Sequence, residues 1–222
     1  MKKFAFTMAE ILLSLTIIGV VAAITLPSLT GNINERTWNT QRKALYARMS
    51  QAIALMPALN GFGVATGIGT SSAVDTAAET FVASGLSKVL KINNVCDNEH
   101  FEDCGIPTSY ADMTGTQKEL PTTLHGLNGF FSSVAYSTTS YKADDTKAVA
   151  FETQNGESIV AYYNIDCRSN QENMFEFPTA TMCVNFVYDL NGSKGPNTVG
   201  KDIGFITVFD ASDSTVVAPL PS

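Results

Sequence analysis

The sequence has few positive charges and only two histidines, and these shortages exclude several classes of function. Lys and Arg together number 14, against 21 Asp and Glu, which gives a formal net charge of -7 at pH 7. A general nucleic-acid-binding surface neutralises phosphates with clustered Lys and Arg, so no such binding is expected. His100 and His125 show no metal-ligand spacing with each other or with the cysteines.

Sequence motifs for catalysis are also lacking. There is no Gly-x-Ser-x-Gly elbow and no Cys–His pattern that would indicate a nucleophile. The segment Gly192-Ser-Lys-Gly195 is too short for a phosphate-binding loop and lies between two expected strands. We therefore expect no enzymatic activity.

Cysteine is absent from the first 95 residues, which excludes a lipoprotein anchor near the N-terminus. The four cysteines form two local pairs, Cys96 with Cys104 and Cys167 with Cys183. An even number in an exported chain indicates disulfides, although four cysteines allow three pairings. We expect the local pairing, because each bond would close a short loop among turn-forming residues. The alternative, four buried thiols in a cytosolic protein, is disfavoured by the export segment at the N-terminus.

Long apolar runs are confined to the N-terminal part of the chain. Lys2 and Lys3 precede Phe6-Thr-Met-Ala-Glu10, and residues 11–26 carry no charge. A helix over residues 6–26 would rise about 31 Å, roughly the thickness of one hydrocarbon core. The segment is predicted to cross a membrane once, with the two lysines on the cytoplasmic side.

Glu10 lies inside this apolar run. A carboxylate there costs several kcal/mol unless it is paired or held near the interface, and such residues are usually functional. Cleavage after Ala5 would free the α-amino group of Phe6, four residues before Glu10. The carboxylate could meet that amine in its own helix or in the next subunit of a bundle, where the pair would fix the axial register.

Lys-Lys-Phe-Ala5, Phe6-Thr-Met-Ala-Glu10 and the apolar helix resemble the class III leader of type IV pilins and type II secretion pseudopilins. The resemblance implies that a membrane aspartyl prepilin peptidase cuts between Ala5 and Phe6 and N-methylates Phe6. Gly19 and Pro27 match the family positions where the helix breaks, and both residue types weaken or kink helices. Ala5 departs from the Gly that is usual in the family.

The resemblance implies a structural filament subunit. The precursor would wait in the bacterial cytoplasmic (inner) membrane, in contact with lipid, with its head outside. An assembly ATPase and a platform membrane protein would then extract it into a helical cell-surface filament, made with copies of itself and other pilin-like subunits.

Two other interpretations of the N-terminus remain open. The first is a secretory signal peptide cut after Ala23, although Glu10 within the apolar core argues against it. The second is a signal-anchored exported binding module that does not polymerise.

The expected fold is α+β and pilin-like, with a long N-terminal helix packed on a C-terminal antiparallel sheet. The expected parts are a leader (1–5), a membrane or filament-core helix (6–27), an amphipathic continuation (28–56), a variable connection (57–146) and the sheet with its C-terminal loop (147–222). The amphipathic part ends before Pro57. Its apolar residues recur at helical spacing: Trp38, Leu45, Met49, Ala52, Ile53 and Met56.

Four strands are expected in the C-terminal part. Residues 147–153 and 157–163 are rich in β-forming residues, and Asn155-Gly156 between them predicts a two-residue hairpin turn. Residues 182–189 and 203–210 are the other two strands. In the connection, a short helix is expected within 73–90.

The loop between the last two expected strands resembles a C-terminal loop found in many pseudopilin-like sequences. Asp189, Asn191, Asn197 and Asp202 offer side-chain oxygens, which Ca²⁺ prefers in exported proteins. Related pseudopilins bind Ca²⁺ in a loop of this region, but their ligand pattern differs. The alternative is a loop held by hydrogen bonds of the Asx type without a metal.

Overall fold

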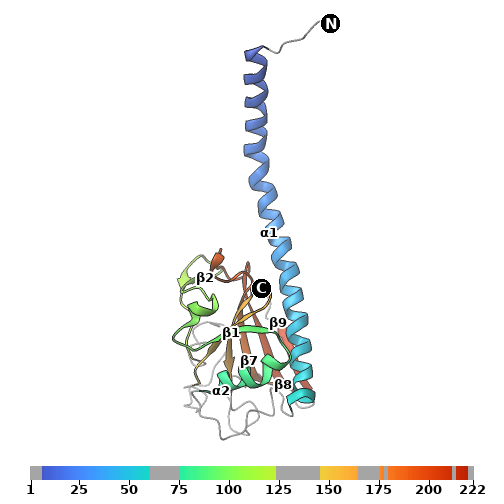
Figure 1. Cartoon of the computed structure of the whole chain (residues 1–222), viewed down its shortest axis with the longest axis vertical. Helices are drawn as coiled ribbons and strands as arrows, with labels where there is room; N and C mark the ends of the chain where they lie inside the picture. The colour runs from blue at the N-terminus through green and yellow to red at the C-terminus, as the bar shows by residue number, and fades with distance from the viewer. Residues whose placement is uncertain are drawn as a thin grey trace. The chain divides into compact units, whose positions relative to one another are not determined.

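A computed structural model of the protein describes residues 7–60, 76–123, 146–164, 176–177, 180–211 and 214–219 (Figure 1). The chain divides into two units, Met1–Gln41 and Arg42–Ser222. Helix α1 (Met8–Asn60) contributes to both units. An N-terminal apolar helix and a C-terminal antiparallel sheet make the class α+β, as predicted.

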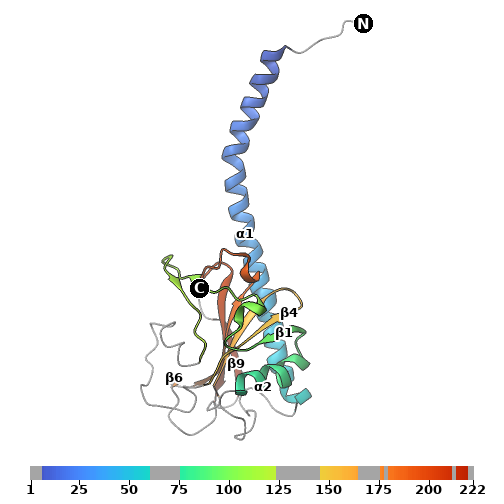
Figure 2. The same ribbon diagram turned by 60° about the vertical axis from the view of Figure 1, so that its left-hand side comes forward.

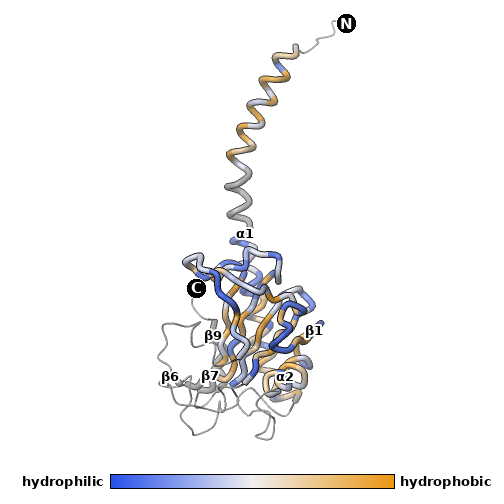
Figure 3. The backbone as a smooth tube through the Cα atoms, turned by 90° about the vertical axis from the view of Figure 1, so that its left-hand side faces the viewer, coloured by the Kyte–Doolittle hydropathy of each residue, from blue (hydrophilic) through white to orange (hydrophobic). Residues whose placement is uncertain are grey.

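The first unit is the early part of α1, and its surface is apolar. Met8–Thr25 has a mean hydropathy of 2.2, and none of it is buried. Its large side chains lie open, from 49% exposed at Ile11 to 80% at Met8. Figure 3 shows this stretch as predominantly hydrophobic. By length and composition, the segment is able to cross a membrane.

Helix α1 does not break within the single chain. It is helical through Gly19 and Pro27, so the predicted loosening there stays a prediction for the packed filament. The predicted end at residue 56 was wrong, because α1 continues past Pro57 to Asn60. A proline in the last turn removes only one helical hydrogen bond, which explains why the turn survives.

In the second unit, which we call the head, the later part of α1 buries the predicted apolar stripe. Its members recur at helical spacing and are at most 4% exposed, namely Leu45, Met49, Ala52, Ile53 and Met56. Figures 1 and 2 show this part of the helix beside the sheet. Trp38, in the first unit, is half-buried.

The main sheet of the head is antiparallel. Its order is β1 (Ile92–Cys96), β4 (Val149–Thr153), β5 (Ser158–Tyr163), β7 (Ala180–Asp189), β8 (Ile203–Ala211) and β9 (Ser214–Pro219). The short β6 (Glu176–Phe177) also pairs with β7. The four predicted strands correspond to β4, β5, β7 and β8, which are neighbours in this order.

The β4–β5 hairpin is confirmed, but its turn differs from the prediction. The Thr153 amide donates to the Glu157 carbonyl at 2.9 Å, which leaves a three-residue loop rather than two. Gly156 takes a positive φ of 82°. This arrangement, a turn followed by a left-handed glycine, is the usual three-residue hairpin.

The region expected as a connection, 57–146, contributes to the sheet. β1 pairs with β4 in antiparallel register, with Cys96 opposite Ala150. A small separate hairpin, β2 (Tyr110–Ala111) with β3 (Gln117–Lys118), follows it. The sheet therefore begins earlier in the chain than residue 147. β1 was missed because its partner is far away in sequence.

The helix expected within 73–90 is a series of short turns. They are α2 (Ala77–Thr80), the π-helical η2 (Phe81–Gly85) and the 3₁₀ turn η3 (Leu86–Lys88). Phe81 is fully buried and stacks on Tyr163 of β5, with ring centroids 4.9 Å apart. These turns therefore close one face of the sheet.

The other face of the sheet carries the predicted disulfide. Cys96 and Cys104 are bonded, and both lie in a buried cluster with Ala150 and Val160. The bond closes a loop through the 3₁₀ turn η4 (Phe101–Cys104). Cys183 is buried in β7 and is also disulfide-bonded. Its predicted partner, Cys167, lies outside the described residues.

Candidate functional sites

The first candidate site is the start of α1, where Thr7 and Glu10 cap the helix. The Glu10 carboxylate accepts from the Thr7 amide at 2.8 Å and from the Thr7 hydroxyl at 2.9 Å. The Thr7 hydroxyl in turn accepts from the Glu10 amide at 3.4 Å. This is a capping box, which satisfies amide donors that a helix start otherwise leaves open. The Thr-x-x-Glu pattern is visible in the sequence, but sequence analysis overlooked Thr7.

Glu10 is the only charged side chain in Met8–Thr25, and it is fully exposed. The hydroxyls nearby donate to the helix's own carbonyls: Ser14 to Glu10 at 2.7 Å, and Thr16 to Leu12 at 2.7 Å. Such internal bonds leave few unsatisfied polar groups on the surface. One carboxylate thus stands at the start of an otherwise apolar helix face. Ala5 and Phe6, the predicted processing residues, lie outside the described residues.

The second candidate site is the loop from Asp189 to Asp202, which joins β7 to β8. The Leu190 amide donates to the Asp202 carbonyl at 3.0 Å and closes the base of the loop. The Asp202 carboxylate accepts from the amides of Asn197 and Thr198, both at 2.8 Å. Asp189 accepts from the Asn191 amide at 3.0 Å. Hydrogen bonds of the Asx type therefore do organise this loop, as the metal-free alternative expected.

Three side-chain oxygens in the same loop remain without a hydrogen bond. They are buried atoms, and the described part of the chain offers them no donor: Asp189 Oδ2, Asn191 Oδ1 and Asn197 Oδ1. A buried oxygen without a partner costs free energy, about 1–3 kcal/mol each. All three belong to the four residues predicted as Ca²⁺ ligands. An oxygen-only set of carboxylate and amide groups suits Ca²⁺.

The electrostatics of the loop also favour a cation. Burial raises the pKa of Asp189 to about 7, and the negative charge of Asp202 adds to this rise. Hydrogen bonds from the Asn191 and Gly192 amides oppose it. Asp189 is 2% exposed and Asp202 is fully buried. Two buried carboxylates in one loop repel each other unless a positive charge lies between them.

The loop is anchored to α1 and to the small hairpin. Arg42 Nη2 donates to the carbonyl oxygens of Gly200 and of Lys201, the latter at 2.6 Å. The Ala111 amide donates to the Asn197 carbonyl at 2.8 Å, and the Val199 amide donates to the Ala111 carbonyl at 2.9 Å. Sequence analysis missed Arg42 and Ala111 because both act across long separations that no local pattern reveals.

Among the residues that the structure describes, no group of three or more His, Cys, Asp or Glu side chains is placed to hold an ion. Comparison with known proteins adds no assignment: no family model, curated protein or solved structure matches this chain.

Proposed function

We propose that this chain is the structural subunit of a type IV pilus-like or type II secretion filament. A prepilin peptidase would cut between Ala5 and Phe6 and methylate the new amine. The exposed apolar part of α1 would lie in lipid before assembly and in the filament core afterwards. Assembly would use a platform membrane protein and an ATPase, and the head would face outward.

One observation supports this proposal above the others: Glu10 is the single charge on the exposed apolar stretch Met8–Thr25. A plain membrane anchor does not need a charge at that position, because an uncharged glutamine would complete the cap equally well. In a bundle of identical apolar helices, a Glu10 carboxylate paired with a Phe6 amine fixes how far each helix slides past the next. The capping box shows that Glu10 also orders the helix start, so an experiment has to separate the two roles.

Glu10→Gln separates them, because glutamine also serves in a capping box but carries no charge. We expect this variant to enter the membrane normally and to yield almost no sheared surface filament. Thr7→Ala weakens the cap and keeps the carboxylate, so it should retain most of the filament. Ser14→Leu, a polar-to-apolar change one turn further on, is the matched control for added hydrophobicity.

Normal filaments from Glu10→Gln would contradict the proposed register pair. Equal losses from Glu10→Gln and Thr7→Ala would assign Glu10 to capping alone. A wild-type chain that is exported but never polymerises would support the anchored binding module instead.

We also propose that the Asp189–Asp202 loop binds Ca²⁺. Asp189, Asn191 and Asn197 would supply the three unpartnered buried oxygens, and Asp202 the second carboxylate. Bound Ca²⁺ would offset the repulsion between the carboxylates. It would thereby stiffen the loop that Arg42 attaches to α1.

Thermal unfolding of the full chain in detergent tests this site. About 1 mM Ca²⁺ should raise Tm by roughly 3–6 °C if the affinity is that of an extracellular module. Asp189→Asn should abolish the shift while stabilising the metal-free chain, since it removes a buried charge. Asp112→Asn, the same change in another turn, should keep the shift. A wild-type chain without a Ca²⁺ shift, or an Asp189→Asn chain with an unchanged shift, would remove the site.

A further inference from the structure

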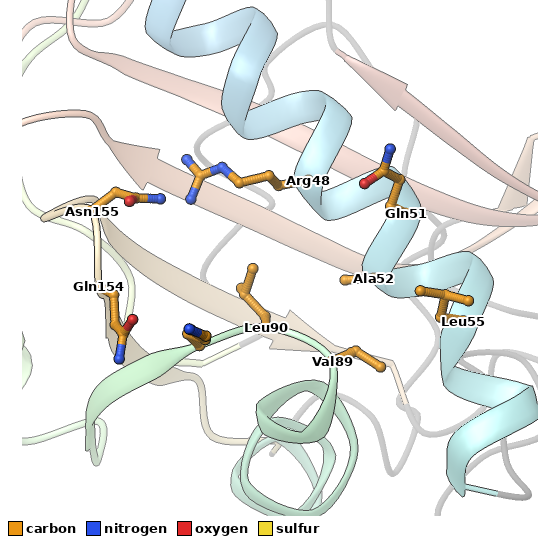
Figure 4. A pocket seen from close by; sticks show the side chains of 9 residues that line it. Arg48, Gln51, Ala52, Leu55, Val89, Leu90, Gln154 and Asn155 are labelled. Atoms are coloured by element: carbon orange, nitrogen blue, oxygen red, sulfur yellow. The ribbon is translucent and has the colours of Figure 1, made fainter.

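A groove of about 250 Å³ opens on the head between α1 and the start of β1. Its apolar lining includes Ala52 and Leu55 of α1 with Leu90 (Figure 4). Leu55 is 52% exposed, although it lies on the helix that packs against the sheet. Exposed apolar surface framed by polar side chains is typical of contact sites.

The charge of the groove is positive. Of its lining residues, only Arg48 and Lys91 are charged. Arg48 forms an ion pair with Glu157, which lies outside the lining. Lys91 is exposed, and the described residues give its ammonium group no partner. The groove therefore offers one uncompensated cation beside apolar side chains.

The opposite charge lies at the other end of β1, in the loop closed by the Cys96–Cys104 disulfide. The loop carries four acids and no Lys or Arg. One of these acids already has a partner, since Asp97 Oδ1 lies 2.7 Å from His100 Nδ1. The carboxylates of Glu99 and Glu102 are exposed and accept no hydrogen bond from the described part of the chain. The disulfide and η4 hold this loop in one shape, which lowers the entropic cost of docking it.

Among the described residues, Lys91 forms no ion pair with the acids of this loop. Lys91 precedes β1 and Asp97 follows it, so their Cα atoms are six extended steps apart, about 20 Å. A second copy has no such restriction. We propose that the acidic disulfide loop of one subunit docks in the groove at Lys91 of the next subunit.

This inference rests on the proposed filament, in which all subunits point the same way. The groove of one copy and the loop of the next are different surfaces, so the contact between them is heterologous and repeats without closing. The contact adds a charge-complementary link between heads to the packing of the apolar helices, and complementary charges chiefly select partner and register.

Zero-length cross-linking tests the contact directly. Wild-type filaments, grown from a mixture of ¹⁴N- and ¹⁵N-labelled chains, are treated with a carbodiimide, which joins an amine to a carboxylate in contact. We expect peptides in which Lys91 of one label is joined to Glu99 or Glu102 of the other. Intact filaments that give Lys91 no mixed-label link to this loop would overturn the inference and leave the proposed function standing. Absence of filaments would instead count against the proposed function.

A charge swap provides the second test. Lys91→Glu alone, or Glu99→Lys with Glu102→Lys, places like charges together and should lower the yield of sheared filament about tenfold. Co-production of the two variants should restore the yield, because each basic site then faces an acidic one in an alternating filament. Lys88→Glu, an equal charge change on an exposed lysine outside the groove lining, is the control. Equal losses from the control, or no rescue on mixing, would overturn the proposed contact.

Discussion

Arg48 of α1 forms an ion pair with Glu157, the residue that follows the β4–β5 turn. The side chain of Arg48 is 30% exposed, whereas that of Glu157 is only 7% exposed. Glu157 also accepts a hydrogen bond from the Thr153 hydroxyl. The pair joins the helix to the hairpin across a separation of 109 residues. Apolar contacts alone would let the later part of α1 shift along the sheet. The ion pair therefore fixes where the helix lies on the sheet.

The unequal burial of the pair predicts unequal losses of stability. Arg48→Met should lower the free energy of unfolding by about 3 kcal/mol, because it leaves the buried Glu157 carboxylate without a charged partner. Glu157→Gln should cost about 1–2 kcal/mol, since Arg48 still reaches water. Denaturant unfolding of the full chain in detergent measures both values.

The double variant is the control for this pair. Arg48→Met with Glu157→Gln should cost less than the sum of the single losses, because neither charge is then left alone. A larger loss from Glu157→Gln than from Arg48→Met would contradict the assignment of Glu157 as the more buried partner.

Asp112 predicts a dependence of stability on acid pH. Hydrogen bonds from the Thr114 hydroxyl and the Thr116 amide hold its pKa at about 2, below its ordinary 3.8. A carboxyl whose pKa is lowered by folding contributes stability above its unfolded value and loses it as pH falls toward the folded value. The Tm difference between wild type and Asp112→Asn should therefore be constant above pH 4 and shrink between pH 4 and 2. A difference that does not change over this range would show that the charged form is not the stabilised one.

Gly204 predicts a packing requirement on β8. Gly204 lies opposite Tyr188 in the β7–β8 register, and a Cβ at Gly204 would lie 2.3 Å from Tyr188 Oη. Gly204→Ala should therefore cost about 1–3 kcal/mol of unfolding free energy. Adding Tyr188→Ala removes the overlap, so the double variant should be less unstable than the two single losses together. Fully additive losses would show that the two side chains do not collide.

Sequence patterns predicted those parts of the fold that depend on residues close together in the sequence. The buried stripe from Leu45 to Met56 follows from helical spacing, and the β4–β5 hairpin follows from two β-rich runs around Asn155-Gly156. β1 was not predicted, because Ile92–Cys96 lacks strong alternation and depends on a partner in β4. β9 was also missed, although its partner β8 directly precedes it in the chain, with Ala211 opposite Ser214.

For the candidate sites too, sequence analysis named residues that are close together in the chain but not the contacts between distant segments. The oxygen-bearing residues of the Asp189–Asp202 loop were named from the sequence, because Asp, Asn and Gly at short spacing form such loops. Their burial and the missing hydrogen bonds depend on packing against distant residues. The link through Arg42 and the groove at Lys91 likewise join segments far apart in the chain. Spacing along a single sequence gives no information on such contacts.

The central claim is that an acid in an apolar helix pairs with an amine freed by cleavage, and mass spectrometry of the mature N-terminus tests it most directly. The claim predicts that the chain recovered from the membrane and from filaments begins at N-methyl-Phe6. A mature chain that keeps Met1–Ala5, or one that begins at Ile24 without the apolar helix, would contradict it.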